Sequence, residues 1–131
     1  MRLTERHEWL LVSLVALHSA IIGVVFILAP NWTVHFGGWE RIDPAFFGRQ
    51  AGAFHIVLAA GYLVEFARHR GISLILIAKT FAFVFLMVHA VLDPLPWAVP
   101  TSGVLDGLMA LVVWWVHKAV GAGKADAGSR I

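Results

Sequence analysis

Four apolar stretches, separated by short polar or proline-containing segments, predict four membrane-spanning helices. Each stretch is roughly 20 residues long, which is the length that a helix needs to cross a ~30 Å hydrocarbon layer. We expect one domain, residues 1–120, with helices at about 9–29, 44–66, 72–93 and 102–118. The tail, residues 121–131, is rich in Gly and Ala and is expected to be flexible.

Prolines mark the ends of these helices. Pro30 is expected to end the first helix, and Pro44 to lie in the first turn of the second. The segment 31–43 reads as an interfacial turn. Pro94 closes the third helix, and the loop through Pro100 is expected to be non-helical, with Thr101 or Ser102 capping the fourth helix. Short connections make consecutive helices antiparallel neighbours, so we predict an all-α antiparallel four-helix bundle.

Composition supports an integral membrane protein. The chain has 131 residues, of which 60% are hydrophobic and only 14% charged, a balance unlike that of a soluble domain. It contains no cysteine, which excludes disulfides and thiolate chemistry. The net charge of +2 comes from basic residues beside the spans, so the bilayer is the expected partner and nucleic acid is not.

The distribution of Lys and Arg predicts the orientation. Only Arg41 and Arg49 fall on one side of the predicted spans. The other side carries a larger basic set: Arg2, Arg6, Arg68, Arg70, Lys118, Lys124 and Arg130. By the positive-inside rule both termini are expected to be cytoplasmic, in a multi-pass protein of the inner membrane.

Ionisable residues recur at helical spacing on the faces that the predicted helices turn inward. A charged group within a bilayer is costly and normally faces a protein interior or a wet cavity. Counted from the outer helix ends, polar residues of three helices come to one level: Arg49, Gln50, His89, Asp93 and Asp106. This outer cluster is interpreted either as a structural ion-pair clasp or as a pocket for a quinone head group or another small polar ligand.

Two further pairs lie deeper. His18 and His55 come to the same depth on neighbouring helices, which permits either a hydrogen-bonded pair or bis-histidine ligation of haem b. Glu65 and Lys79 form an expected inner-half polar pair, with a proton-relay role as the alternative. His89 and Asp93 lack a third ligand, so no metal site is expected.

The pattern resembles the DoxX-like and BphX-like small four-helix membrane proteins. The resemblance rests on Arg49-Gln50-Ala51-Gly52, on Lys79 and on Asp106-Gly107. It implies a bacterial inner-membrane protein linked to redox systems, some DoxX-type members being subunits of a thiosulfate:quinone oxidoreductase. The lack of cysteine departs from any thiol-based version of that chemistry, and no catalytic residue is transferred.

These observations favour an accessory subunit of a membrane redox system, without catalytic activity of its own, that binds a quinone or small ligand. Two alternatives stay open: an electron carrier with haem b, and a small transporter or proton-coupled carrier that uses Lys79, Glu65 and the outer cluster. Four helices would need to oligomerise to form a transport path, so a homo-oligomer or partner subunits are expected in that case.

Overall fold

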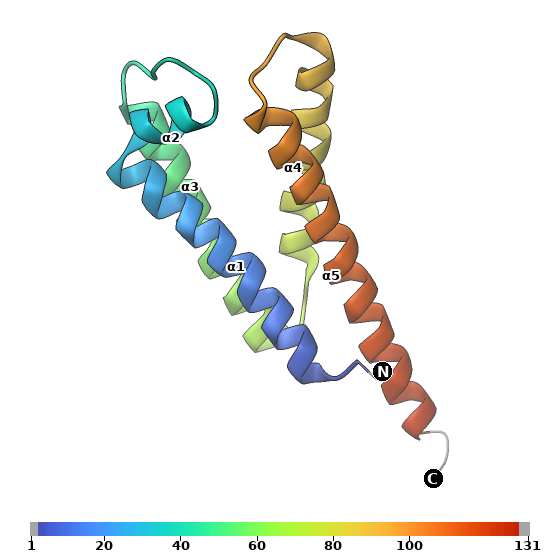
Figure 1. Ribbon diagram of the computed structural model, residues 1–131. Coiled ribbons are helices and arrows are strands. Elements are labelled where there is room, and N and C mark those ends of the chain that lie inside the picture. The colour runs from blue at the N-terminus through green and yellow to red at the C-terminus, as the bar shows by residue number, and fades with distance from the viewer. Residues whose placement is uncertain (1–2, 129–131) are drawn as a thin grey trace.

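The computed structural model describes the backbone of residues 3–128 and the side chains of residues 3–123. As expected, it is all-α with long apolar helices (Figure 1). Its elements are α1 (Glu5–Leu28), α2 (Pro30–Phe36), α3 (Phe46–His69), α4 (Ser73–Leu92) and α5 (Ala98–Gly128). Of these, α1, α3, α4 and α5 are long and apolar enough to cross a membrane.

The helices pack as two antiparallel hairpins. The first hairpin is α1 against α3, with the short α2 between them in sequence, and the second hairpin is α4 against α5. In Figure 1 both chain ends lie at the lower end of the molecule, which we call the terminal end; the opposite end is the loop end. Contacts between the hairpins, α1 with α5 and α3 with α4, are fewer than contacts within each hairpin.

The hydrophobic core that joins the hairpins lies in the terminal half. Tyr62, Phe66 and Ile75 are almost fully buried there, together with residues from all four long helices. The members of this core are Val12, Val15, Ala16, Ala59, Tyr62, Phe66, Ile72, Ile75 and Val113. Towards the loop end the two hairpins are drawn apart in Figure 1.

Helix α1 begins four residues before the expected start because the charged head contains a helix cap. Thr4 is the N-cap residue, and both its backbone N–H and its hydroxyl bond to the ring Nδ1 of His7, at 3.2 and 2.7 Å. Glu5 and Glu8 then lie in the first turn, where negative charge interacts favourably with the helix dipole. A Thr-x-x-His cap is less familiar than Thr-x-x-Glu, which is why the sequence pattern did not indicate it.

Two connections differ from the expected loops. The segment after α1 is not only a turn, because Pro30 ends one helix and begins the next, as the N1 residue of α2. The second hairpin also departs from expectation, because α5 begins at Ala98 and includes Pro100. Proline is tolerated in a first helical turn, where its missing N–H would have no helical partner. The expected cap at Thr101 or Ser102 is therefore wrong.

The remaining helix bounds differ less. Pro44 and Ala45 form the turn that leads into α3, and α3 extends to His69 rather than to Phe66. Helix α4 lies one residue inside the expected range at each end. The tail expected to be flexible is helical through Gly128, and the rest of it lies outside the described residues.

Candidate functional site: a polar centre between the hairpins

A buried ion pair lies inside the second hairpin. Lys79 Nζ of α4 donates to Asp106 Oδ1 of α5 at 2.6 Å, and the two side chains are only 5% and 15% exposed. Burying a charge without compensation is very costly, so each of these groups requires the other. The pair is therefore the electrostatic centre of the α4–α5 interface.

The position of Asp106 follows from the early start of α5. With the helix beginning at Ala98, Asp106 lies about 12 Å along the axis from the start of the helix, at 1.5 Å per residue. The expected start near residue 102 placed it about one turn closer to the membrane surface. This extra turn brings Asp106 towards mid-span, to the level of Lys79.

The first hairpin presents imidazole and hydroxyl groups to this pair. His18 of α1 and His55 of α3 both lie within electrostatic range of Lys79 and of Asp106, and Tyr62 of α3 lies within range of Asp106. The charges of the second hairpin thus interact with polar side chains of the first. We call Lys79, Asp106, His18, His55 and Tyr62 the polar centre.

Among the described residues, two buried side-chain atoms of α1 have no hydrogen-bond partner. These are Nδ1 of His18 and Oγ of Ser19, and Ser19 is only 1% exposed. A buried polar group normally has a hydrogen-bond partner, so an unpaired one indicates a place where water or a ligand completes the bonding. The unpartnered Nδ1 of His18 belongs to the same centre as the ion pair.

The structure corrects the expected pairing of Glu65 with Lys79. Glu65 instead accepts hydrogen bonds from the backbone N–H groups of Ser73 and Leu74, at 3.2 and 2.9 Å. These N–H groups open α4, where a carboxylate stabilises the unpaired donors and the positive end of the helix dipole. Glu65 is thus a cap supplied from a neighbouring helix, and Lys79 takes Asp106 as its partner.

The outer cluster does not assemble as expected. Arg49, Gln50 and Asp93 are exposed, and the His89 ring bonds the carbonyl of Phe85 on its own helix through Nδ1, at 2.8 Å. Among the described residues, no hydrogen bond or ion pair joins any of these four to Asp106. Of the five residues in the expected cluster, Asp106 alone takes part in the polar centre.

The haem interpretation does not fit the packing of α1 and α3. A Cβ added at Gly52 would lie 2.5 Å from the carbonyl oxygen of Gly23, so the two backbones are in direct contact. This contact lies within about 8 Å along the axes from His18 and His55. A macrocycle ligated on both faces by these histidines has to lie between their helices. The close approach leaves it no room, so we derive no chemistry from haem.

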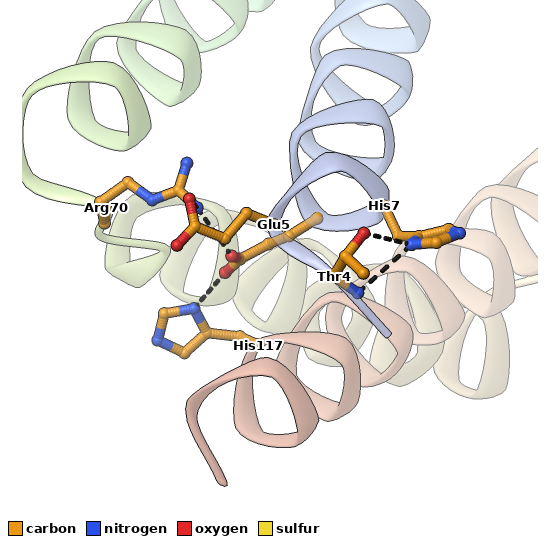
Figure 2. Close-up of polar contacts among 6 residues, drawn as sticks. Thr4, Glu5, His7, Arg70 and His117 are labelled. Carbon is orange, nitrogen blue, oxygen red and sulfur yellow. Dashed lines mark hydrogen bonds and ion pairs between the residues drawn. The ribbon is translucent and has the colours of Figure 1, made fainter. Parts of the chain in front are cut away.

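A second cluster ties three elements together at the terminal end. Glu8 of α1 is 4% exposed and accepts from His117 Nδ1 of α5 at 2.5 Å and from Arg70 Nη2 at 3.3 Å. Arg70 follows α3 in the left-handed conformation and also pairs with Glu5 at 3.2 Å (Figure 2). Its guanidinium lies over the Phe66 ring. We call Glu5, Glu8, Arg70 and His117 the terminal clasp.

The terminal clasp is not predicted by the sequence pattern, because its residues lie at the ends of the long helices. Charged residues there usually face water, so the sequence pattern predicts solvent exposure for His117 and gives it no partner. A signal was present, since Glu8 is an acid placed among basic residues that share one end of the bundle. Because the clasp is satisfied internally, we assign it a structural role.

Comparisons with protein-family models, with curated proteins and with solved structures find no match to this chain. In the described part of the chain, no three His, Asp or Glu side chains gather in a set that could hold a metal ion. The polar centre is therefore the candidate functional site.

Proposed function

We propose that this chain is a bacterial inner-membrane protein that binds the head group of a quinone at the polar centre, as an accessory subunit of a membrane redox system. The observation that carries the proposal is the buried Lys79–Asp106 pair, which interacts electrostatically with His18 and His55 of the other hairpin. Ionisable residues inside a membrane domain are expensive and are typical of sites that bind or transfer something.

The chemistry of the centre suits a quinone head group. Quinone carbonyl oxygens accept hydrogen bonds, and Lys79 is a donor held at mid-span by Asp106. His18 carries an unpartnered ring nitrogen that can donate or accept, depending on its tautomer. The four long apolar helices offer hydrophobic surface against which an isoprenoid tail can lie. The resemblance to DoxX-like proteins adds a link to redox systems, and we assign the chain no catalytic step of its own.

The orientation belongs to the same proposal. Both termini lie at one end of the molecule, and Arg6, Arg68 and Lys118 are exposed near that end, which we place on the cytoplasmic side. Because the natural chain has no cysteine, single cysteines report topology directly. An impermeant maleimide added to intact spheroplasts should label Glu40→Cys at the loop end and spare Gly123→Cys. The reverse labelling pattern would disprove the orientation.

Quinone binding is measured on the purified protein in nanodiscs by quenching of its tryptophan fluorescence with decylubiquinone. We expect saturable quenching by the wild type, and at least tenfold weaker binding by Lys79→Met and by Asp106→Asn. Asp93→Asn is the matched control, because Asp93 belongs to the expected outer cluster but is exposed. Equal binding by the wild type and both centre variants would refute the site.

The accessory role needs a separate experiment, because binding alone does not identify a partner. Mild-detergent isolation of the tagged chain from its native membrane, followed by mass spectrometry, should recover a redox enzyme subunit. A chain recovered alone and monodisperse would argue against the accessory role and leave the binding site standing. We favour binding over transport because Glu65, required by the carrier hypothesis, is bound to the start of α4.

A further inference from the structure

The two hairpins are held together differently in the two halves of the molecule. In the terminal half they share the hydrophobic core around Tyr62, Phe66 and Ile75, and the terminal clasp adds the bond from His117 to Glu8. These contacts combine apolar burial with a buried charged hydrogen bond, so separating the hairpins here would be costly. The terminal half is therefore the fixed part of the molecule.

In the loop half, the helices of each hairpin pack closely against each other. Gly23 meets Gly52 within the first hairpin. In the second hairpin, a Cβ added at Gly103 would lie 3.2 Å from Leu86 Cβ, and one added at Gly107 would lie 2.8 Å from the Phe83 ring. Each hairpin is thus a closely packed unit up to the loop end, and a rigid unit can move as a whole.

At the loop end the hairpins meet again through a small contact between their loops. The Phe36 ring at the end of α2 lies edge-on to the Trp97 ring, with centroids 5.7 Å apart. Beside them, Gly37 lies against Ala98 and Gly38 against Pro96. Phe36 and Trp97 are 64% and 53% exposed, so their contact buries little surface. We call the contact of residues 36–38 with 96–98 the latch.

We propose that the latch is a lid on the polar centre: the hairpins pivot about the terminal half, and opening of the latch admits the ligand from the loop end. The placement of the polar centre supports this, because Lys79 and Asp106 come from one hairpin and His18 and His55 from the other. A pivot would separate these groups, and a bound head group would draw them together. The identity of the ligand rests on the function proposed above, whereas the movement does not.

A disulfide across the latch tests the movement. A Cβ at Gly37 would lie 3.2 Å from Ala98 Cβ, close to the separation of about 3.5–4.5 Å that a disulfide requires, so Gly37→Cys with Ala98→Cys should lock the lid. The new Cβ would also lie 2.9 Å from the Trp39 ring. Because Trp39 is 37% exposed, its side chain can shift towards solvent. The absence of natural cysteines makes this crosslink unique.

The control lock lies within one hairpin. Leu86→Cys with Gly103→Cys joins α4 to α5 at the same Cβ separation of 3.2 Å but does not cross between hairpins. Each lock is formed by oxidation, verified by mass spectrometry, and compared with its own reduced form. Any disturbance from the substitutions themselves is then present on both sides of the comparison.

The first readout needs no ligand. His55→Cys is added to each pair, and its modification by a small methanethiosulfonate reagent is timed after the lock has closed. We expect at least tenfold slower modification with the latch locked, full recovery on reduction, and no change with the control lock. Equal rates with the latch open and locked, or no modification in either form, would overturn the lid.

The second readout is the association rate of decylubiquinone, which we expect to fall at least tenfold in the latch-locked form only. If the modification rate responds to the lock while decylubiquinone fails to bind the wild type, the lid stands and the quinone proposal falls. If decylubiquinone binds equally fast to the locked and reduced forms, the quinone site stands and the lid is refuted as its entry route.

Discussion

Lys79 Nζ lies 2.6 Å from Asp106 Oδ1, and this bond joins α4 to α5 near mid-span. Both groups are largely buried, so each compensates the charge of the other. Replacing Lys79 by Met or Asp106 by Asn leaves the partner without its counter-ion. Each change should lower the free energy of unfolding by about 3–5 kcal/mol, measured by denaturant titration in mixed micelles.

The double variant Lys79→Met with Asp106→Leu separates charge pairing from simple loss of contact. With both charges gone, no uncompensated group remains, and the apolar replacements suit their surroundings. We expect most of the lost stability to return, so that the double variant is more stable than either single variant. Additive losses would show that the pair does not act as a unit. Recovery of stability without recovery of decylubiquinone binding would assign the charges to binding.

The terminal clasp provides a matched pair of carboxylates. Glu8 is 4% exposed and accepts from both His117 and Arg70, whereas the side chain of Glu5 is 54% exposed and shares Arg70. Glu8→Gln should cost about 3 kcal/mol, because it removes the buried charge that His117 and Arg70 face. Glu5→Gln should cost at most about 1 kcal/mol, as exposed ion pairs do. Thermal unfolding of the two variants side by side checks the difference.

The crossing of α1 and α3 depends on two glycines. An added Cβ at Gly52 would lie 2.5 Å from the Gly23 carbonyl oxygen, which is backbone and can yield only if the helices separate. Gly52→Ala should therefore destabilise the first hairpin by about 1–3 kcal/mol. The control is Gly121→Ala, since Gly121 is helical and, in the described part of the chain, an added Cβ would meet nothing within 4 Å beyond its own helix backbone and chain neighbours. That change should be neutral or stabilising, by up to about 1 kcal/mol.

The long helices were predictable because hydrophobic length is a strong signal with little competition. The ends of the helices were harder to predict, since they depend on local capping interactions. The Thr4–His7 cap moved the start of α1, and the tolerance of a first turn for Pro100 moved the start of α5. That second shift of one turn carried Asp106 from the expected outer cluster to Lys79. An error of four residues in a helix start thus changed the partner of a charged residue.

The pairing of side chains between helices was the least predictable part. Spacing correctly placed ionisable residues inside the helical region, but depth along each helix does not specify how the helices rotate and cross. His18 and His55 interact electrostatically with the same ion pair. The Gly23–Gly52 contact, which argues against haem between them, cannot be predicted from spacing along the helices. Arg49 and Asp93 are both exposed, and among the described residues no ion pair joins them.

The partner of Lys79 can be tested directly, because a pair with Glu65 and a pair with Asp106 predict different coupling energies between substitutions. As a cap on α4, it accepts from Ser73 N and Leu74 N, and Glu65→Ala should cost about 1–2 kcal/mol through loss of those bonds. If Lys79 belongs to Asp106, the effects of Glu65→Ala and Lys79→Met should add within about 0.5 kcal/mol in a double-mutant cycle. Asp106→Asn with Lys79→Met should instead show coupling of at least about 1 kcal/mol in the same assay.

The opposite result would be strong coupling between Glu65 and Lys79 and no coupling between Lys79 and Asp106. It would mean that Glu65 pairs with Lys79, as the sequence predicted. The polar centre would then lose its cation, and with it the donor that the quinone site requires.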